Sequence, residues 1–118
     1  MTGMLKQRLT EGKWVQAEGA VYDEFDPGLH VIEPFTPPPH ARYIVGIDFG
    51  YTNPLVCSLW YLDEDERMYL TRQIYKSRRT ITDHLPAIRD MTRGLNIEAW
   101  VTDHAAQDRA TLENALGI

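Results

Sequence analysis

The pattern of hydrophobic and polar residues predicts three strands in the middle of the chain. Residues 42–50, RYIVGIDFG, form a nearly continuous apolar run, which is typical of a strand buried on both faces. Residues 55–63, LVCSLWYLD, predict a second strand, and the charged segment 63–67, DEDER, predicts the turn after it. Residues 68–76, MYLTRQIYK, alternate in polarity and predict a third strand. Together the three strands are expected to form an antiparallel meander.

Alternation within the third strand also predicts which way its side chains face. Met68, Leu70 and Ile74 are expected on one face of the sheet. The other face is expected to carry the positions between them, Tyr69, Thr71, Gln73 and Tyr75.

The hydrophobic period then changes to that of a helix. Apolar residues recur at spacings of three and four, at Ile81, Leu85, Ile88 and Met91. Thr82 or Asp83 is expected to cap the start of this helix, so Pro86 is expected in its first turn, where a missing N–H does little harm. Gly94 is the expected stop.

A fourth strand and a second helix complete the predicted fold. Residues 96–103, NIEAWVTD, predict the strand. Residues 108–117, DRATLENALG, predict a short helix with Leu112 and Leu116 facing inward and Gly117 at its end. The order is β-β-β-α-β-α, an α/β fold. Its helical crossover allows the fourth strand to lie parallel to the first and beside it.

The N-terminal third of the chain has no such regular pattern. Residues 5–12, LKQRLTEG, predict the end of a helix, and residues 26–28, DPG, predict a turn. The prolines within residues 34–40, PFTPPPH, predict an extended connector, because proline cannot join a helix or a central strand. A boundary is therefore expected at about residues 36–41. The apolar residues between positions 15 and 33 are expected to cover the sheet or its edge.

Composition limits the class of protein. The 118 residues suffice for one small domain, and no stretch approaches the roughly 20 apolar residues of a membrane span. The single cysteine, Cys57, excludes an internal disulfide and is expected to be a buried thiol in a reducing compartment. A net charge of −5 argues against a protein that coats nucleic acid by bulk charge. It leaves open an enzyme that uses carboxylates to hold metal ions against a phosphodiester.

Two aspartates are the candidates for such a site. Asp48 ends the first predicted strand and Asp103 ends the fourth. If these strands are parallel neighbours, both residues lie at the carboxyl ends of the strands, where sites form in open α/β sheets. Neighbouring strands are about 4.8 Å apart. The two carboxylates could then share a metal ion. Each also has a purely structural interpretation: Asp48 as a turn aspartate that accepts N–H groups of GYTN, and Asp103 as a helix N-cap.

Other polar and aromatic residues give weaker signals. The densest basic cluster is YKSRR, in which Lys76, Arg78 and Arg79 could contact DNA phosphates or form a solvated loop. None of the four histidines pairs with another at metal-ligand spacing, which argues against a structural zinc; His104 adjoins Asp103. The three tryptophans are expected to pack in the core or at its edge, at Trp14, Trp60 and Trp100.

Three segments of the chain are similar to the large terminase subunit of tailed bacteriophages. They are GKWVQAEGAVYDEFD (residues 12–26), YIVGIDFGYTNP (43–54) and VTDHAA (101–106). Proteins of that family package viral DNA with an ATPase and cut it with a C-terminal nuclease. The resemblance implies a ribonuclease H-like mixed sheet truncated before its last strand and helix. It also implies that residues 1–38 are the ATPase-to-nuclease junction, and that residues 39–118 are the N-terminal part of the nuclease.

The resemblance also implies a chemistry and a setting. Asp48 and Asp103 match the first and second catalytic carboxylates, which would hold Mg²⁺ or Mn²⁺ for a two-metal cleavage of double-stranded DNA. The third carboxylate comes from a later helix in the family, so this chain alone is expected to be inactive. No Gly-x-x-x-x-Gly-Lys-Ser/Thr loop is present. The implied partners in the full-length protein are the portal and the small terminase subunit, in the cytoplasm of the bacterial host.

Two alternatives stay open. GIDFGYTN (residues 46–53) also resembles the first phosphate motif of the actin, hexokinase and heat-shock chaperone ATPases, although the chain has no second Gly-rich loop and is too short for two nucleotide-clamping lobes. The other alternative is a folded but non-enzymatic prophage remnant.

Overall fold

The computed structural model describes residues 21–118, which divide into two compact units between Phe35 and Thr36. In the first unit, a single helical turn, α2 (Pro27–His30), replaces the simple turn predicted at Asp26–Gly28. The Asp26 side chain caps it by accepting the Gly28 N–H at 3.0 Å. The predictions for the helix that ends at Gly12 and for Trp14 lie outside the described residues.

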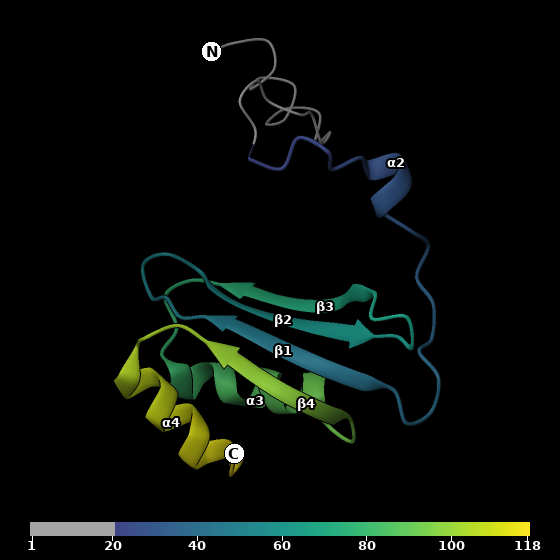
Figure 1. Cartoon of the computed structure of the whole chain (residues 1–118). Coiled ribbons are helices and arrows are strands. Elements are labelled where there is room, and N and C mark those ends of the chain that lie inside the picture. The colour runs from purple at the N-terminus through teal and green to yellow at the C-terminus, as the bar shows by residue number, and fades with distance from the viewer. Residues whose placement is uncertain (1–20) are drawn as a thin grey trace, which may run out of the picture. The chain divides into compact units, whose positions relative to one another are not determined.

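The second unit contains a four-stranded mixed sheet with the order β3-β2-β1-β4 (Figure 1). The strands are β1 (Arg42–Asp48), β2 (Leu55–Leu62), β3 (Met68–Lys76) and β4 (Asn96–Thr102). The β1–β2 and β2–β3 pairs are antiparallel, and β1 pairs with β4 in parallel. The predicted order β-β-β-α-β-α and the parallel placement of the fourth strand beside the first are therefore confirmed.

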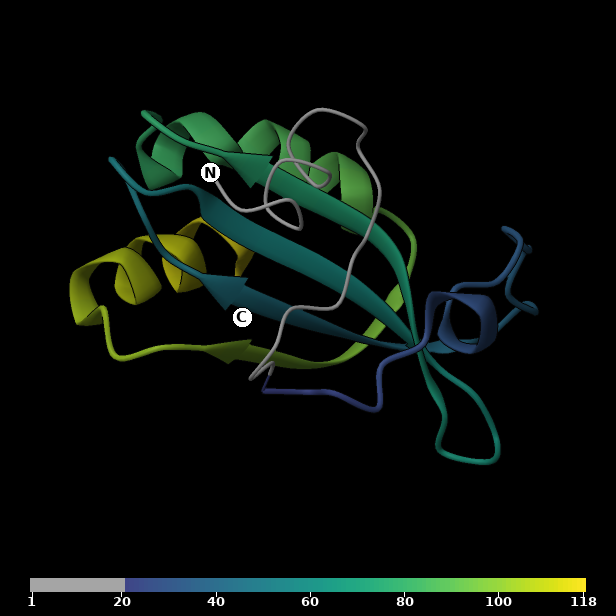
Figure 2. The same ribbon diagram turned by 90° about the horizontal axis from the view of Figure 1, so that it is seen from above.

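Two helices, α3 (Ile81–Thr92) and α4 (Ala106–Leu116), lie on the same face of the sheet (Figures 1 and 2). Alternate residues of β1 and β2 point to that face and are buried, while the positions between them are half-buried or exposed. β1 is thus buried on one face rather than on both within this unit. The core consists of Ala41, Tyr43, Val45, Ile47, Leu55, Cys57, Leu59, Tyr61, Leu85, Ile88, Met91 and Leu112.

The predicted facing of β3 is wrong because the strand contains a bulge. The register between β2 and β3 shifts by one residue, so that Leu59 pairs with Arg72 and Trp60 pairs with Leu70. The extra residue is Thr71, whose hydroxyl donates to the Leu59 carbonyl at 3.1 Å. A bulge reverses the alternation on either side of it. The half-buried positions of the strand are consequently Tyr69 and Ile74, whereas Met68 and Leu70 are exposed.

The start of α3 also differs from the prediction. Its N-cap is Thr80, not Thr82 or Asp83, and the Thr80 hydroxyl accepts the Asp83 N–H at 3.2 Å. The Asp83 carboxylate accepts the Thr80 N–H in return at 3.1 Å, which completes a capping box. Pro86 therefore lies inside the helix rather than in its first turn. The helix ends as predicted, with Gly94 in the left-handed conformation at φ 73°.

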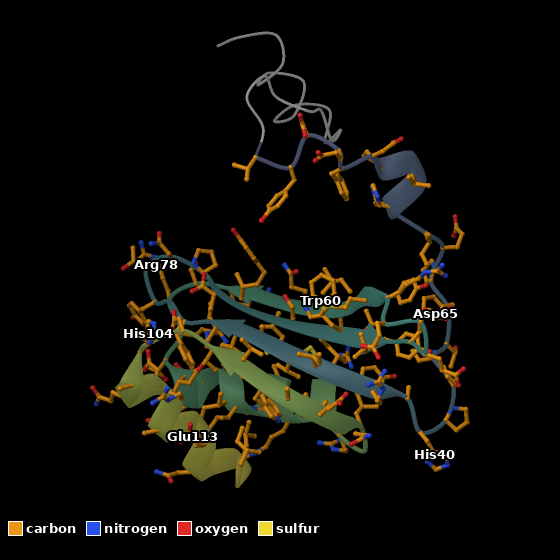
Figure 3. The ribbon with its side chains drawn as sticks, in the orientation of Figure 1. His40, Trp60, Asp65, Arg78, His104 and Glu113 are labelled. Carbon is orange, nitrogen blue, oxygen red and sulfur yellow. The ribbon has the colours of Figure 1, made fainter. Side chains whose placement is uncertain are left out.

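The sheet face opposite the helices is called the open face here. No helix of residues 36–118 lies on it, and Figure 3 shows Trp60 on this side. The strand registers place alternate positions there: Ile44, Gly46, Asp48, Val56, Ser58, Trp60, Leu62, Leu70, Gln73, Tyr75, Ala99 and Val101. Within residues 21–118, no helix is both long and apolar enough to cross a membrane.

Candidate metal and nucleic-acid site

The structure places Asp48 and Asp103 at the same edge of the sheet. Ile47 of β1 pairs with Thr102 of β4 in parallel register, so the next residue of each strand lies at the same level. Both strands end at that edge (Figure 1). The two aspartates also line one concavity of about 380 Å³ on the open face, together with Gly46, Val56, Ser58, Trp60 and Val101. The parallel β1–β4 pair thus places the two residues at the ends of neighbouring strands, as expected from the sequence.

The Asp48 carboxylate has no structural task among the described residues. Its side chain is exposed, and within residues 21–118 it makes no hydrogen bond or ion pair. The alternative role, as a turn aspartate that accepts N–H groups of the following loop, is not what the geometry shows. Asp48 instead lines the concavity at the end of β1, where its carboxylate is accessible to a ligand.

Asp103 has a structural task as well as an exposed position. Its Oδ1 accepts the Ala105 N–H at 3.1 Å, which shapes the turn between β4 and α4. The N-cap of α4 is Ala105, which makes no side-chain cap, so Asp103 is not the N-cap. One carboxylate oxygen is therefore used locally, and the hydrogen bond restricts the direction of the other.

The loop after Asp48 depends on a glycine. A Cβ on Gly50 would lie 2.5 Å from the Asn53 carbonyl oxygen and 2.8 Å from the Pro54 carbonyl oxygen. Both atoms belong to the backbone, so any side chain at this position would force the loop to move. The close turn carries the chain from Asp48 back into β2, and it therefore sets the position of the Asp48 backbone.

The basic turn, defined as residues 76–79 (KSRR), lies at this same edge. β3 is parallel to β1, because each is antiparallel to β2, so Lys76 ends β3 at the edge where Asp48 ends β1. The backbone N–H of Arg78 donates to the Tyr51 carbonyl oxygen at 2.6 Å, which ties the basic turn to the loop after Asp48. Figure 3 shows Arg78 and His104 at the same end of the sheet.

The carboxylates of Asp48 and Asp103 are the type of ligand that a hard divalent ion prefers. Asp48 and Asp103 offer carboxylate oxygens, which Mg²⁺ and Mn²⁺ prefer, and Mg²⁺ is commonly held by one or two carboxylates with water and phosphate completing its shell. No group of three or more His, Cys, Asp or Glu residues suited to a metal occurs within residues 21–118. Among the described residues, the pair Asp48 and Asp103 is therefore the candidate ligand set for a single ion.

Sequence reasoning missed one polar residue that the fold buries. His84 is 1% exposed, and neither of its ring nitrogens has a hydrogen-bond partner among the described residues. Burial, followed by the charge of Arg79, lowers the pKa of His84, while Asp83 acts in the opposite direction. The signal was present in the sequence, because His84 shares the helical spacing of Ile88 and Met91.

Comparisons with known proteins identify structural relatives. No protein-family model matches the chain, and no curated protein matches it. Its structure is similar to that of the large terminase from a thermophilic bacteriophage, with a TM-score of 0.72 and 27% sequence identity. It is also similar to the P22 large terminase nuclease domain, with a TM-score of 0.59 and 24% identity.

These likenesses differ in how much of each protein they cover. The match to the thermophilic phage terminase covers 100% of this chain and 32% of that protein, and the P22 match covers 71% of this chain and 47% of the nuclease domain. The chain thus spans less than half the length of either relative. The fold is ribonuclease H-like, as predicted, and the resemblance to phage large terminases is confirmed.

Proposed function

We propose that this chain is part of the nuclease of a phage large terminase, and that Asp48 and Asp103 are two of its metal-binding catalytic residues. The supporting observation is their position at the carboxyl ends of adjacent parallel strands, where they line one concavity. The similarity to phage large terminases favours this function over the ATPase alternative. The substrate would be double-stranded DNA.

The chain's own residues would divide the work at the site. Asp48, whose carboxylate makes no hydrogen bond or ion pair among the described residues, would present both carboxylate oxygens to Mg²⁺ or Mn²⁺. Asp103 would contribute the oxygen that Ala105 does not use. A divalent ion held there would neutralise charge on a phosphodiester and acidify a water molecule. Gly50 would keep Asp48 in place by permitting the close turn that follows it.

Cleavage in this class of enzyme uses two ions roughly 4 Å apart, whose mutual repulsion must be offset by several carboxylates. Within residues 21–118, only Asp48 and Asp103 are candidates here, and no group of three or more His, Cys, Asp or Glu residues suited to a metal occurs. We therefore expect this chain to bind one ion weakly and to cleave DNA no faster than a variant without Asp48.

A plasmid-nicking assay tests the expectation that this chain alone does not cleave DNA efficiently. The full chain and its Asp48→Ala variant are incubated with supercoiled plasmid and either Mg²⁺ or Mn²⁺. The expected result is equally slow nicking by both proteins. Efficient nicking by the wild type alone would show that two carboxylates suffice, which would contradict the stated ligand requirement.

A further inference from the structure

We propose that the basic turn, residues 76–79, binds the phosphate backbone of DNA beside Asp48 and Asp103. This inference rests on the nuclease function proposed above, and it names the surface that holds the substrate there. The contact would be independent of DNA sequence, since phosphates are the same at every base pair.

The position of the basic turn suits a strand that passes the carboxylates. Lys76 pairs with Leu55, and Asp48 pairs with Val56, so Lys76 and Asp48 are separated by two strand spacings. Two spacings amount to roughly 10 Å. A DNA strand carries one charge per roughly 3.4 Å along its axis, so the turn would contact phosphates about three nucleotides from the phosphate at the carboxylates.

The charges of the basic turn are available to a ligand. Three other cations of the unit are engaged with acids: Arg42 with Glu66 and Glu98, Arg93 with Asp90, and Arg109 with Glu113. Within residues 21–118, by contrast, neither Lys76 nor Arg78 forms an ion pair, and both are exposed. Arg79 is also exposed, and its charge contributes to lowering the pKa of the Asp83 carboxyl, although backbone and side-chain hydrogen bonds from Thr80 are the main cause.

The backbone of the basic turn is held in one conformation. Arg78 has φ 59°, in the left-handed region that non-glycine residues seldom adopt. Its N–H bond to the Tyr51 carbonyl oxygen, at 2.6 Å, holds it there. Residues kept in such conformations cluster at binding and catalytic sites. A phosphate bound at the turn would therefore be fixed relative to the loop that follows Asp48.

Two exposed tyrosines extend this surface. Tyr51, whose carbonyl holds the turn, is 57% exposed, and Tyr75, which precedes Lys76, is 61% exposed. Tyr75 pairs with Val56, the residue opposite Asp48, so it lies in the same row of the open face. Tyrosine hydroxyls are among the side-chain groups that donate to DNA phosphate oxygens.

The test is the salt dependence of DNA binding in EDTA, where divalent ions play no part. Fluorescence anisotropy with a labelled duplex of about 20 base pairs gives the affinity of the full chain between about 50 and 200 mM salt. The turn variant is Lys76→Gln/Arg78→Asn/Arg79→Gln, in which asparagine tolerates the left-handed conformation. Each lost phosphate contact should reduce the slope of log affinity against log salt by about 0.9, so the triple variant should lose between about two and three units of slope.

A matched control removes the same charge elsewhere. Arg67→Gln/Arg72→Gln/Arg93→Gln also lowers the net charge by three, but these residues lie in mid-strand or toward the opposite edge of the sheet. The slope should change by less than about one unit in this control. The double variant Lys76→Gln/Arg79→Gln leaves the Arg78 backbone intact and should still lose between about one and two units. Equal effects of the turn variant and the control, or no DNA binding by the wild type, would overturn the proposal.

A second pair of variants tests whether the DNA lies beside the carboxylates. In EDTA, Asp48→Asn/Asp103→Asn should raise the DNA affinity several-fold, because two negative charges next to the backbone are removed. Asp65→Asn/Asp90→Asn, away from the site, should not. No increase for the first pair would refute the placement. Because metal is absent, these results stand apart from whether Asp48 and Asp103 bind an ion.

Discussion

Replacing Gly50 with alanine should distort the loop that positions Asp48. The new Cβ would lie 2.5 Å from one backbone oxygen and 2.8 Å from another, and neither can rotate away as a side chain would. Forcing such a contact typically costs between about 1 and 3 kcal/mol. For a domain of this size, that corresponds to a fall in melting temperature of roughly 5 to 20 °C.

Gly46→Ala supplies the matched control on the preceding strand. A Cβ on Gly46 would meet nothing within 4 Å, and the residue lies inside β1, where glycine is about 0.5–1 kcal/mol less favourable than alanine. This variant should be as stable as the wild type or slightly more stable. Urea denaturation of the three proteins measures the difference. A Gly50→Ala variant with wild-type stability would refute the argument that the close turn requires glycine.

Three further outcomes are expected. The pKa of His84 is lowered mainly by burial, so as the pH falls from about 7.5 to about 5.5 the unfolded chain binds the proton before the folded chain does, and the free energy of unfolding falls. His84→Leu should weaken this pH dependence in urea denaturation. An unchanged pH profile in the variant would contradict this expectation. Thr80→Ala should lower the free energy of unfolding by about 1 kcal/mol through loss of the capping box, whereas Thr82→Ala should not. Burial raises the pKa of the Cys57 thiol to about 12, so iodoacetamide at about pH 8 should alkylate the urea-unfolded chain and spare the folded one.

The arrangement of the strands could be predicted because it depends on long-range rules that the sequence displays. A change of period between the third and fourth strands indicates a helical crossover, and that crossover makes β4 parallel to β1. The position of Asp48 and Asp103 at the ends of neighbouring parallel strands follows from this topology alone. Cys57 was likewise predictable as a buried residue, because it lies within an apolar strand.

Local irregularities could not be read from the same pattern. The bulge at Thr71 changes the facing of β3, and it arises from pairing with β2 rather than from the strand's own alternation. The cap of α3 lies at Thr80 because the Asp83 side chain can return its hydrogen bond. The contact between Arg78 and Tyr51 joins two loops distant in sequence, and only the folded chain brings them together.

The proposed role of the two aspartates is tested most directly by locating a bound ion. Mn²⁺, added in small steps to the ¹⁵N-labelled full chain, broadens the amide signals of residues near it. We expect the signals around Asp48 and Asp103 to broaden first, and Asp48→Asn or Asp103→Asn to abolish or strongly weaken that effect, while Asp65→Asn leaves it intact. The assignment of Asp48 and Asp103 as metal ligands would be contradicted if the signals of the acidic turn, residues 63–66, broadened first and if neither site variant changed that result.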